Sequence, residues 1–182
     1  MTDELWLRSL EAHHPGLDAS ASGHFCGAAA VALARHDTPP TRCNVDALGE
    51  HAEHLLWWNL PADDTRRAHN SRQDATRDGA YAVGLVFTHH RLELVAVARA
   101  EDGSGADWYV APPGRGLTET GQPDFDDPML HRLEVKGRDH GSLTPAVVQA
   151  AGQLARAPSE LPAMLSIVSF ADDRVVIAHV EP

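Results

Sequence analysis

The segment Leu130–Arg138 (LHRLEVKGR) constrains the fold most, because its centre alternates strictly between apolar and charged side chains. Side chains of a β-strand point alternately to its two faces. Leu133 and Val135 would therefore face a core, while Glu134 and Lys136 would share the opposite face. A carboxylate and an ammonium on one sheet face are costly to bury unless they are paired or serve a function. The segment thus predicts a strand with one core face and one face that carries a candidate site.

Residues 71–182 read as one α/β unit built around that strand. The expected elements are a helix over Ala75–Phe87, strands over Leu92–Ala98, Asp107–Ala111 and Leu130–Lys136, a helix that begins at Thr144, and strands over Ala163–Phe170 and Arg174–Val180. Helical spacing, β-branched alternation and a proline in the first turn of the second helix support these assignments. The expected fold is α/β, a mixed central sheet flanked by helices in the order α-β-β-β-α-β-β.

Residues 1–70 carry no recognisable motif and form an N-terminal extension or subdomain. A short helix is expected over Asp3–His13, and a second helix is expected from Asp46 to about Trp58. His24–Arg35 is apolar and fits a helix or a strand. A boundary near Asn70 is plausible because the chain is polar and arginine-rich there. This third of the chain is either a separate subdomain or a set of elements packed on the core, and it is the expected surface for a protein partner or a homodimer.

Composition favours an ordinary globular protein in a reducing compartment. The 182 residues are 43% hydrophobic and 23% charged, and no apolar run has the length of a membrane span. The acidic, polar N-terminus does not resemble a signal peptide. Cys26 and Cys43 form no CxxC pair, so a cytoplasmic location without disulfides is expected.

Charge sets a limit on nucleic-acid binding. The net charge is −11, whereas proteins that grip DNA usually present a basic surface to the phosphates. Any such surface must therefore be local, and Arg72, Arg77, Arg132 and Arg138 are its candidate members. Of the fifteen basic residues, only Lys136 is a lysine, and an ammonium can titrate when buried, whereas a guanidinium cannot.

A second acid gives the strand its functional context. Asp107 opens the expected strand that precedes Leu130–Lys136. An acid, a variable gap and then Glu-x-Lys on a strand, within this element order, resembles the active-site pattern of the PD-(D/E)XK nuclease superfamily. Two features depart from that pattern: Ala106 stands where proline is common, and the Gln-x-x-x-Tyr motif of one branch is not met.

The resemblance implies a divalent-metal-dependent nuclease, with DNA as the expected substrate and Mg²⁺ or Mn²⁺ as cofactor. It assigns the metal to the carboxylates of Asp107 and Glu134 and to the backbone carbonyl of Val135. It also gives Lys136 the task of positioning or deprotonating the attacking water. Hard divalent cations prefer such oxygen ligands, and the metal would polarise the phosphate.

Supporting residues are expected on the two helices. The resemblance places an additional acid, Asp78, on the first core helix. On the second core helix it places a glutamine, for which Gln149 is the first candidate and Gln153 the other.

Two other functions remain open. Proteins with a nuclease fold can lose catalysis and persist as interaction or scaffold subunits of larger complexes, which the negative charge also fits. Alternatively, the chain is a small-molecule binding domain in which Asp107 and Lys136 form only a salt bridge.

Overall fold

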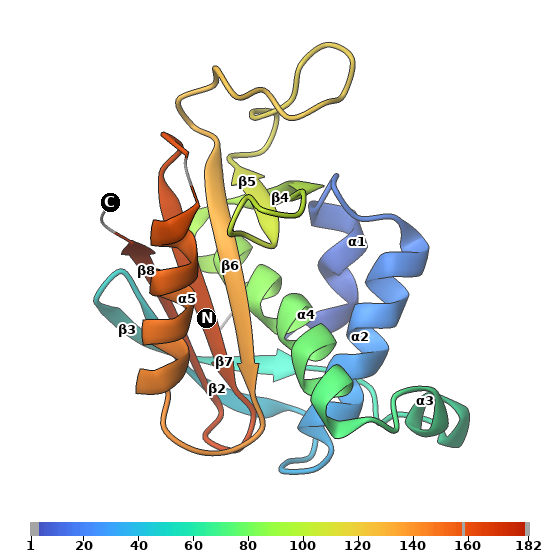
Figure 1. Cartoon of the computed structure of the whole chain (residues 1–182). Coiled ribbons are helices and arrows are strands. Elements are labelled where there is room, and N and C mark those ends of the chain that lie inside the picture. The colour runs from blue at the N-terminus through green and yellow to red at the C-terminus, as the bar shows by residue number, and fades with distance from the viewer. Residues whose placement is uncertain (1–3, 158, 181–182) are drawn as a thin grey trace.

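The computed structural model describes residues 4–157 and 159–180, and within them eight strands form one mixed sheet in the order β1-β3-β2-β8-β7-β6-β5-β4 (Figure 1). The strands are β1 (Leu5–Trp6), β2 (Thr41–Ala47), β3 (Glu50–Trp57), β4 (Val95–Arg99), β5 (Trp108–Ala111), β6 (His131–Arg138), β7 (Ala163–Ser169) and β8 (Arg174–Val180). The helices are η1 (Leu7–Ser9, a 3-10 turn), α1 (Leu10–His13), α2 (Ala19–Leu33), α3 (Asp63–Ala68), α4 (Arg72–Leu92) and α5 (Thr144–Arg156).

The element order predicted for the larger part of the chain is confirmed. From α4 to β8 the chain runs α-β-β-β-α-β-β. Strands β4, β5 and β6 form an antiparallel meander, and α5 then crosses over so that β7 lies parallel to β6. Strand β8 returns antiparallel to β7. The chain is thus an α/β protein whose mixed sheet is flanked by helices.

The two faces of β6 contact different helices. Leu133 and Val135 join a core that α2 and α4 cover. On the other face of the sheet, α5 packs Ala150 and Leu154 against Leu165 and neighbouring side chains of β7. The predicted alternation along β6 is therefore confirmed, and its charged residues lie on the face opposite to α4.

The helix predicted over Asp46–Trp58 is wrong. The segment belongs to the β2–β3 hairpin, whose turn residues Leu48 and Gly49 have positive φ angles of 53° and 84°. Cys43, Val45 and Ala47 alternate inward along β2, which is the period of a strand. Leucine is an unusual residue for a turn position with positive φ, so no turn signal was visible in the sequence.

The rest of the N-terminal third differs in detail. Asp3 lies outside the described residues, and the expected helix over Asp3–His13 is only the strand β1, the η1 turn and the four-residue α1. The ambiguous segment is helical: Asp18 caps α2 by accepting a hydrogen bond from the Ala21 N–H at 2.7 Å. Helix α2 packs on α4, and β2 pairs with β8, so the elements before residue 70 share one sheet and one core with the rest.

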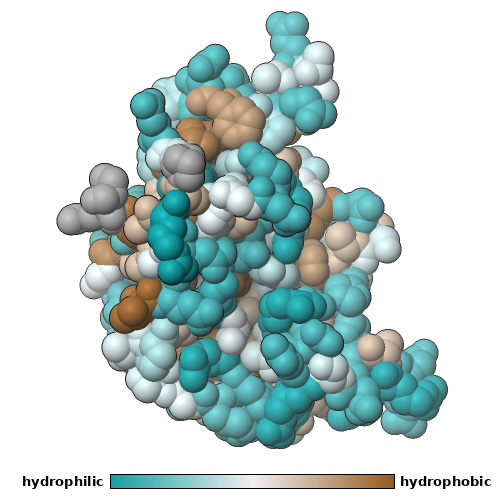
Figure 2. All heavy atoms as spheres, viewed as in Figure 1, coloured by the Kyte–Doolittle hydropathy of each residue, from teal (hydrophilic) through white to brown (hydrophobic). Residues whose placement is uncertain are grey.

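The surface is mostly polar. The face in Figure 2 is largely hydrophilic, with small and separate hydrophobic patches. Among the described helices, none has the length and apolar content that a bilayer crossing requires.

Candidate active site

The candidate site lies where β5 and β6 separate. Their pairing runs from Val110 with His131 to Trp108 with Leu133, and β6 then continues to Arg138 without β5. Asp107 stands at the fork. Its backbone N–H donates to the Leu133 carbonyl at 3.0 Å, and its carboxylate Oδ2 accepts from the Val135 N–H at 2.9 Å. The Asp107 side chain thus takes the place of the missing strand.

Glu134 is fully buried beside this carboxylate. Its exposed fraction is 0%, and it forms an ion pair with Lys136 through Oε1. Its other oxygen, Oε2, accepts no hydrogen bond from the described residues. Burial raises the pKa of Glu134 to about 7, and the charge of Asp107 adds to the rise, while Lys136 opposes it. Two crowded carboxylates with one orphaned oxygen are an arrangement that a cation would stabilise.

Lys136 is held from the α5 side. Its Nζ donates to Gln153 Oε1 at 3.2 Å, and its side chain is 26% exposed. The ammonium therefore bridges the buried Glu134 and the solvent, with Gln153 fixing its direction.

Tyr81 and Arg99 hold Asp107 from the other side, and neither was predicted. The Tyr81 hydroxyl donates to Asp107 Oδ1 at 2.8 Å, and Arg99 Nη2 donates to the same hydroxyl at 3.1 Å. The Arg99 guanidinium lies over the rings of Tyr81 and Trp108, at 4.5 and 4.7 Å. Burial, followed by the charge of Asp107, raises the pKa of Tyr81 to about 12, so the hydroxyl stays a donor.

Two hollows flank the fork and carry most of the nearby cations. A groove of about 530 Å³ between α4 and β6 is lined by Arg72, Arg77, Lys136 and other residues, with Asp139 as its acid. A second hollow of about 410 Å³ brings Arg99 and Arg156 beside Asp107 and Gln153. The first groove is therefore locally basic, whereas the second hollow also carries Glu101 and Asp102 and is not.

Of the residues predicted on the helices to support the site, Gln153 contacts Lys136, whereas Asp78 pairs elsewhere. Asp78 lies on α4 but pairs with His24 at 3.0 Å and with Arg77 at 2.8 Å. Tyr81, one turn further along α4, is the residue that reaches Asp107. On α5, Gln149 is exposed, whereas Gln153 contacts Lys136. The helix side chains that contact Asp107 and Lys136 are thus Tyr81 on α4 and Gln153 on α5.

The four arginines that are predicted to bind phosphate differ in how far they are exposed. Arg72 and Arg77 are largely exposed in the groove, where Arg72 pairs with Asp139 at 3.2 Å. Arg138 is half-buried, and its guanidinium has no ion pair within residues 4–157 and 159–180. Arg132 is 5% exposed and donates to the Ser104 carbonyl. It is a buried structural residue, because strand alternation places it under the turn before β5, and it cannot contact a phosphate.

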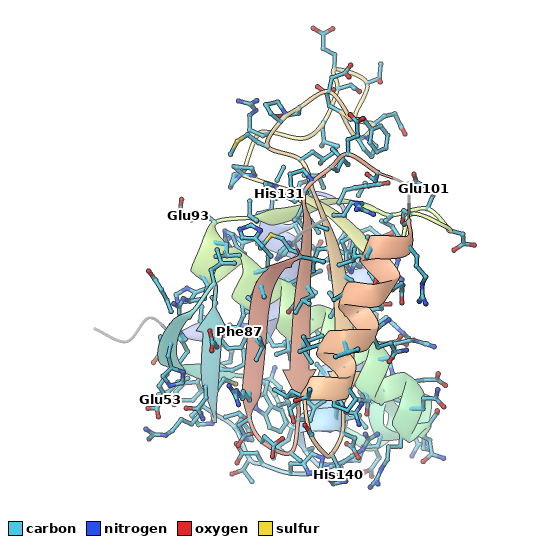
Figure 3. All side chains as sticks on the ribbon, turned by 60° about the vertical axis from the view of Figure 1, so that its left-hand side comes forward. Glu53, Phe87, Glu93, Glu101, His131 and His140 are labelled. Atoms are coloured by element: carbon cyan, nitrogen blue, oxygen red, sulfur yellow. The ribbon has the colours of Figure 1, made fainter. Side chains whose placement is uncertain are left out.

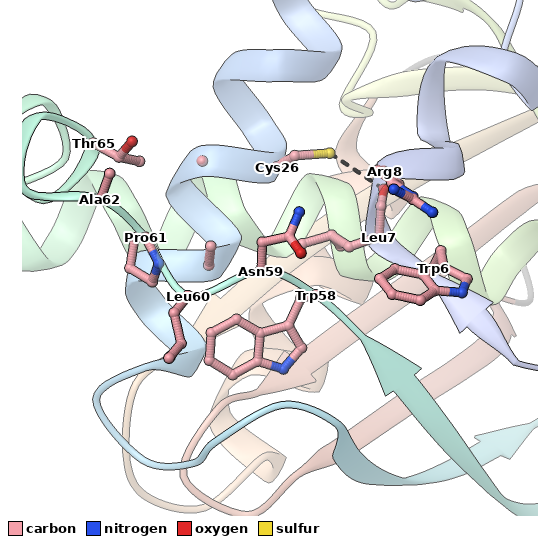
Figure 4. A pocket seen from close by; sticks show the side chains of 12 residues that line it. Trp6, Leu7, Arg8, Cys26, Trp58, Asn59, Leu60, Pro61, Ala62 and Thr65 are labelled. Carbon is pink, nitrogen blue, oxygen red and sulfur yellow. Dashed lines mark hydrogen bonds between the residues drawn. The ribbon is translucent and has the colours of Figure 1, made fainter.

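Another hollow, around Cys26, lacks the features of a catalytic centre (Figure 4). The Cys26 thiol donates to the Leu7 carbonyl at 3.2 Å, and burial raises its pKa to about 11. A thiol that stays protonated is a poor nucleophile.

Comparison with known proteins adds no identity to this geometry. No protein-family model, curated protein or solved structure matches the chain.

Proposed function

We propose that the chain is a divalent-metal-dependent nuclease of the PD-(D/E)XK type, acting on DNA in the cytoplasm. The observation that carries the proposal is the convergence at the β5–β6 fork: Asp107 and Glu134 bring their carboxylates together, and Lys136 contacts Glu134. The residue types and their spacing in the sequence predict these same three residues. The order of elements around them, a three-strand meander followed by a helix and a parallel strand, is the order that the resemblance implies.

The residues fit a hard divalent cation. The orphaned Oε2 of Glu134 and the carboxylate of Asp107 are oxygen ligands of the kind that Mg²⁺ and Mn²⁺ prefer. The N–H of Val135 points to Asp107, and in a strand the C=O of the same residue points to the same edge. Asp107, Glu134 and the Val135 carbonyl would hold the ion, which when bound polarises a phosphate and lowers the pKa of water.

The chain's own residues have distinct tasks in this proposal. Lys136 orients the attacking water or offsets charge on the phosphate, and Gln153 keeps its ammonium aimed at the site. Tyr81 fixes the carboxylate of Asp107 through Oδ1, which leaves Oδ2 bound only to the Val135 N–H. Asp107 and Lys136 are thus each held by a neutral hydrogen-bonding partner, Tyr81 and Gln153 respectively.

DNA is the proposed substrate because the cations lie along the approach to the fork. Arg72 and Arg77 line the groove on one side, and Arg99 and Arg156 line the hollow on the other side. A phosphate chain that runs along the first groove would pass Lys136, which lines it. Phosphate contacts of this kind depend strongly on salt, so binding should weaken as ionic strength rises.

The test is cleavage of single- and double-stranded DNA with and without Mg²⁺ or Mn²⁺. The wild-type protein should cut only with metal, and Glu134→Gln and Lys136→Met should each lower the rate by about a hundredfold or more. Glu53→Gln, a change at an exposed glutamate of β3, is the matched control and should cut normally. Cleavage that persists in Lys136→Met, or that needs no metal, would contradict the proposal.

The complete burial of Glu134 favours a second candidate function, a nuclease fold retained as a binding subunit. A buried carboxylate that already pairs with Lys136 resembles a closed site. A folded wild-type protein that binds neither Mg²⁺ nor Mn²⁺ and cuts no DNA would favour this function over catalysis. A protein partner that co-purifies through the N-terminal third would strengthen it.

A further inference from the structure

A cluster of metal-ligating side chains lies at the end of β6, away from Asp107 and Glu134. His36 follows α2, while Asp139 and His140 follow β6 directly (Figure 3 labels His140). His36 Nε2 is 3.0 Å from Asp139 Oδ1, and His140 Nε2 is 3.1 Å from Asp139 Oδ2. One ligand atom from each residue lies within 4.8 Å of both others.

The Asp139 carboxylate in this cluster is incompletely satisfied. Its side chain is 11% exposed, and its Oδ2 atom is buried. His140 Nε2 and Arg72 Nε lie 3.1 and 3.2 Å from Oδ2, yet neither gives it a hydrogen bond of acceptable geometry. An imidazole nitrogen and a carboxylate oxygen that are close but misaligned can both direct lone pairs at a third point between them.

The spacing and the chemistry fit a zinc ion. Ligands at about 2.0–2.2 Å from a tetrahedral Zn²⁺ lie roughly 3.3 Å apart, and each imidazole nitrogen lies 3.0 or 3.1 Å from one of the two Asp139 oxygens. Two imidazoles and one carboxylate suit Zn²⁺ and similar transition metals, whereas Mg²⁺ takes oxygen ligands and keeps its waters. A set of three protein ligands leaves a fourth position open to water.

Two arginines approach the same carboxylate and must be accommodated. Arg35 Nη1 is 3.4 Å from Asp139 Oδ1, and the Arg72 side chain pairs with Oδ2 while remaining 66% exposed. Arg72 can swing into solvent when a cation arrives. Arg35 also donates to Thr76 Oγ1 at 3.3 Å, so it stays nearby and should weaken binding by charge repulsion.

We propose that His36, Asp139 and His140 form a Zn²⁺ site that ties the end of α2 to the turn after β6. The site lies at one end of the groove between α4 and β6, since Asp139 lines that groove. It is separate from the Asp107–Glu134 pair in position and in metal preference. The proposal therefore stands or falls independently of nuclease activity.

The experiment is calorimetric titration of Zn²⁺ into the full chain, made without a histidine tag and stripped with a chelator. One Zn²⁺ should bind per chain and raise the melting temperature, because a ligand that binds only the folded state stabilises it. Excess Mg²⁺ should not displace it. His140→Asn and Asp139→Asn should each weaken binding by roughly tenfold or more. His140 is exposed, so its replacement does not threaten the fold.

Two controls make the result specific to this cluster. The chain has twelve histidines, and His51→Asn, a change at an exposed histidine of β3, should bind Zn²⁺ as the wild type does. Glu134→Gln should also bind Zn²⁺ normally, even if it abolishes cleavage. Wild-type protein that takes up no Zn²⁺, or His140→Asn protein that binds it unchanged, would overturn the proposal and leave the cluster as an ion-pair network.

Discussion

The Asp107 carboxylate accepts a hydrogen bond at 2.9 Å from the backbone N–H of Val135, the residue between Glu134 and Lys136. This hydrogen bond connects the strand pairing of the sheet to the candidate site. Strand β5 no longer reaches Val135, so a side chain satisfies the N–H that a neighbouring strand would otherwise satisfy. The carboxylate of Asp107, an acid of the candidate site, thus replaces the hydrogen bond that is lost because β5 ends early.

Tyr81→Phe tests how Asp107 is positioned. The change removes one hydrogen bond to a carboxylate, which should cost about 1–2 kcal/mol of folding stability. We expect metal affinity and cleavage rate to fall by about tenfold, as for other residues that orient a metal ligand. Metal titration and DNA cleavage assays would measure both.

Tyr109→Phe is the matched control for that variant. Its hydroxyl donates to Glu101 at 2.9 Å and contacts neither Asp107 nor Glu134. It should lose comparable stability and keep wild-type metal affinity. Equal metal binding by both variants would show that Tyr81 has only a structural role.

Gly137→Ala tests the close approach of β6 and α4. A Cβ atom at Gly137 would lie 2.3 Å from the Thr76 carbonyl oxygen and 2.8 Å from Ala80 Cβ. Because that oxygen belongs to helix backbone, the clash must separate β6 from α4, and we expect a loss of about 1–3 kcal/mol. Denaturant unfolding would measure it.

Gly152→Ala provides the opposite expectation within the same protein. Gly152 lies inside α5, and a Cβ atom there meets nothing within 4 Å. Alanine favours the helix by up to about 1 kcal/mol, so this variant should be more stable than wild type. Two glycine variants that destabilise equally would contradict the packing described for Gly137.

The predictable part of the fold is the part where local patterns were strong. Strand β8 has the predicted bounds, and β7 differs from its predicted bounds by one residue. The β2–β3 hairpin was missed because its turn, Leu48-Gly49, lacks a first residue that favours positive φ. In that hairpin the pairing with β8 outweighed a weak helical pattern, which no local window can reveal.

The candidate site likewise contains residues that the sequence predicts and residues that it does not. Asp107, Glu134 and Lys136 could be chosen because strand alternation and residue type determine which side chains share a face. Tyr81 could not be chosen, and Gln153 was one of two candidates on its helix, because a helix offers several turns and the packing angle decides which turn reaches the site. The one available signal was that Tyr81 and Gln153 stand three and four residues from the predicted Asp78 and Gln149, on neighbouring turns.

In the metal-free protein, Glu134 makes a contribution to folding stability that decreases as pH rises. Its pKa is raised in the fold to about 7 from an ordinary 4.5, so the folded state binds more protons than the unfolded state between these values. Its contribution is fully present below pH 4.5 and is lost as pH passes 7, to a total of a few kcal/mol at most. Urea unfolding with a chelator present, at pH 5 and pH 7.5, would measure this slope.

Glu134→Gln should remove that contribution, and Glu53→Gln should leave it in place. Millimolar Mg²⁺ should stabilise the wild type most at the higher pH, where the carboxylate is ionised and unpaired in its second oxygen. An identical pH dependence in wild type and Glu134→Gln would show that Glu134 titrates normally.

His14 gives a contribution of the opposite sign. It is 1% exposed, and its Nδ1 accepts from the Ala96 N–H at 2.9 Å. Burial, followed by the charges of His89 and His13, lowers its pKa to about 3. Between pH 3 and 6.5 the unfolded chain therefore binds a proton that the fold excludes. The contribution of His14 to folding stability is fully present above pH 6.5, and on acidification it falls by up to about 1.4 kcal/mol per pH unit.

His14→Asn isolates this effect, because the asparagine Oδ1 can accept the same Ala96 N–H without titrating. The folding stability of this variant should fall less steeply on acidification than that of the wild type. His179→Asn, a change at an exposed histidine, should keep the wild-type dependence. Between pH 4.5 and 6.5 the contributions of His14 and Glu134 to folding stability oppose each other. The double variant should therefore keep the wild-type slope there, whereas the two single variants should tilt it in opposite directions. A tilt of the same sign in both single variants would refute the assignment of either group.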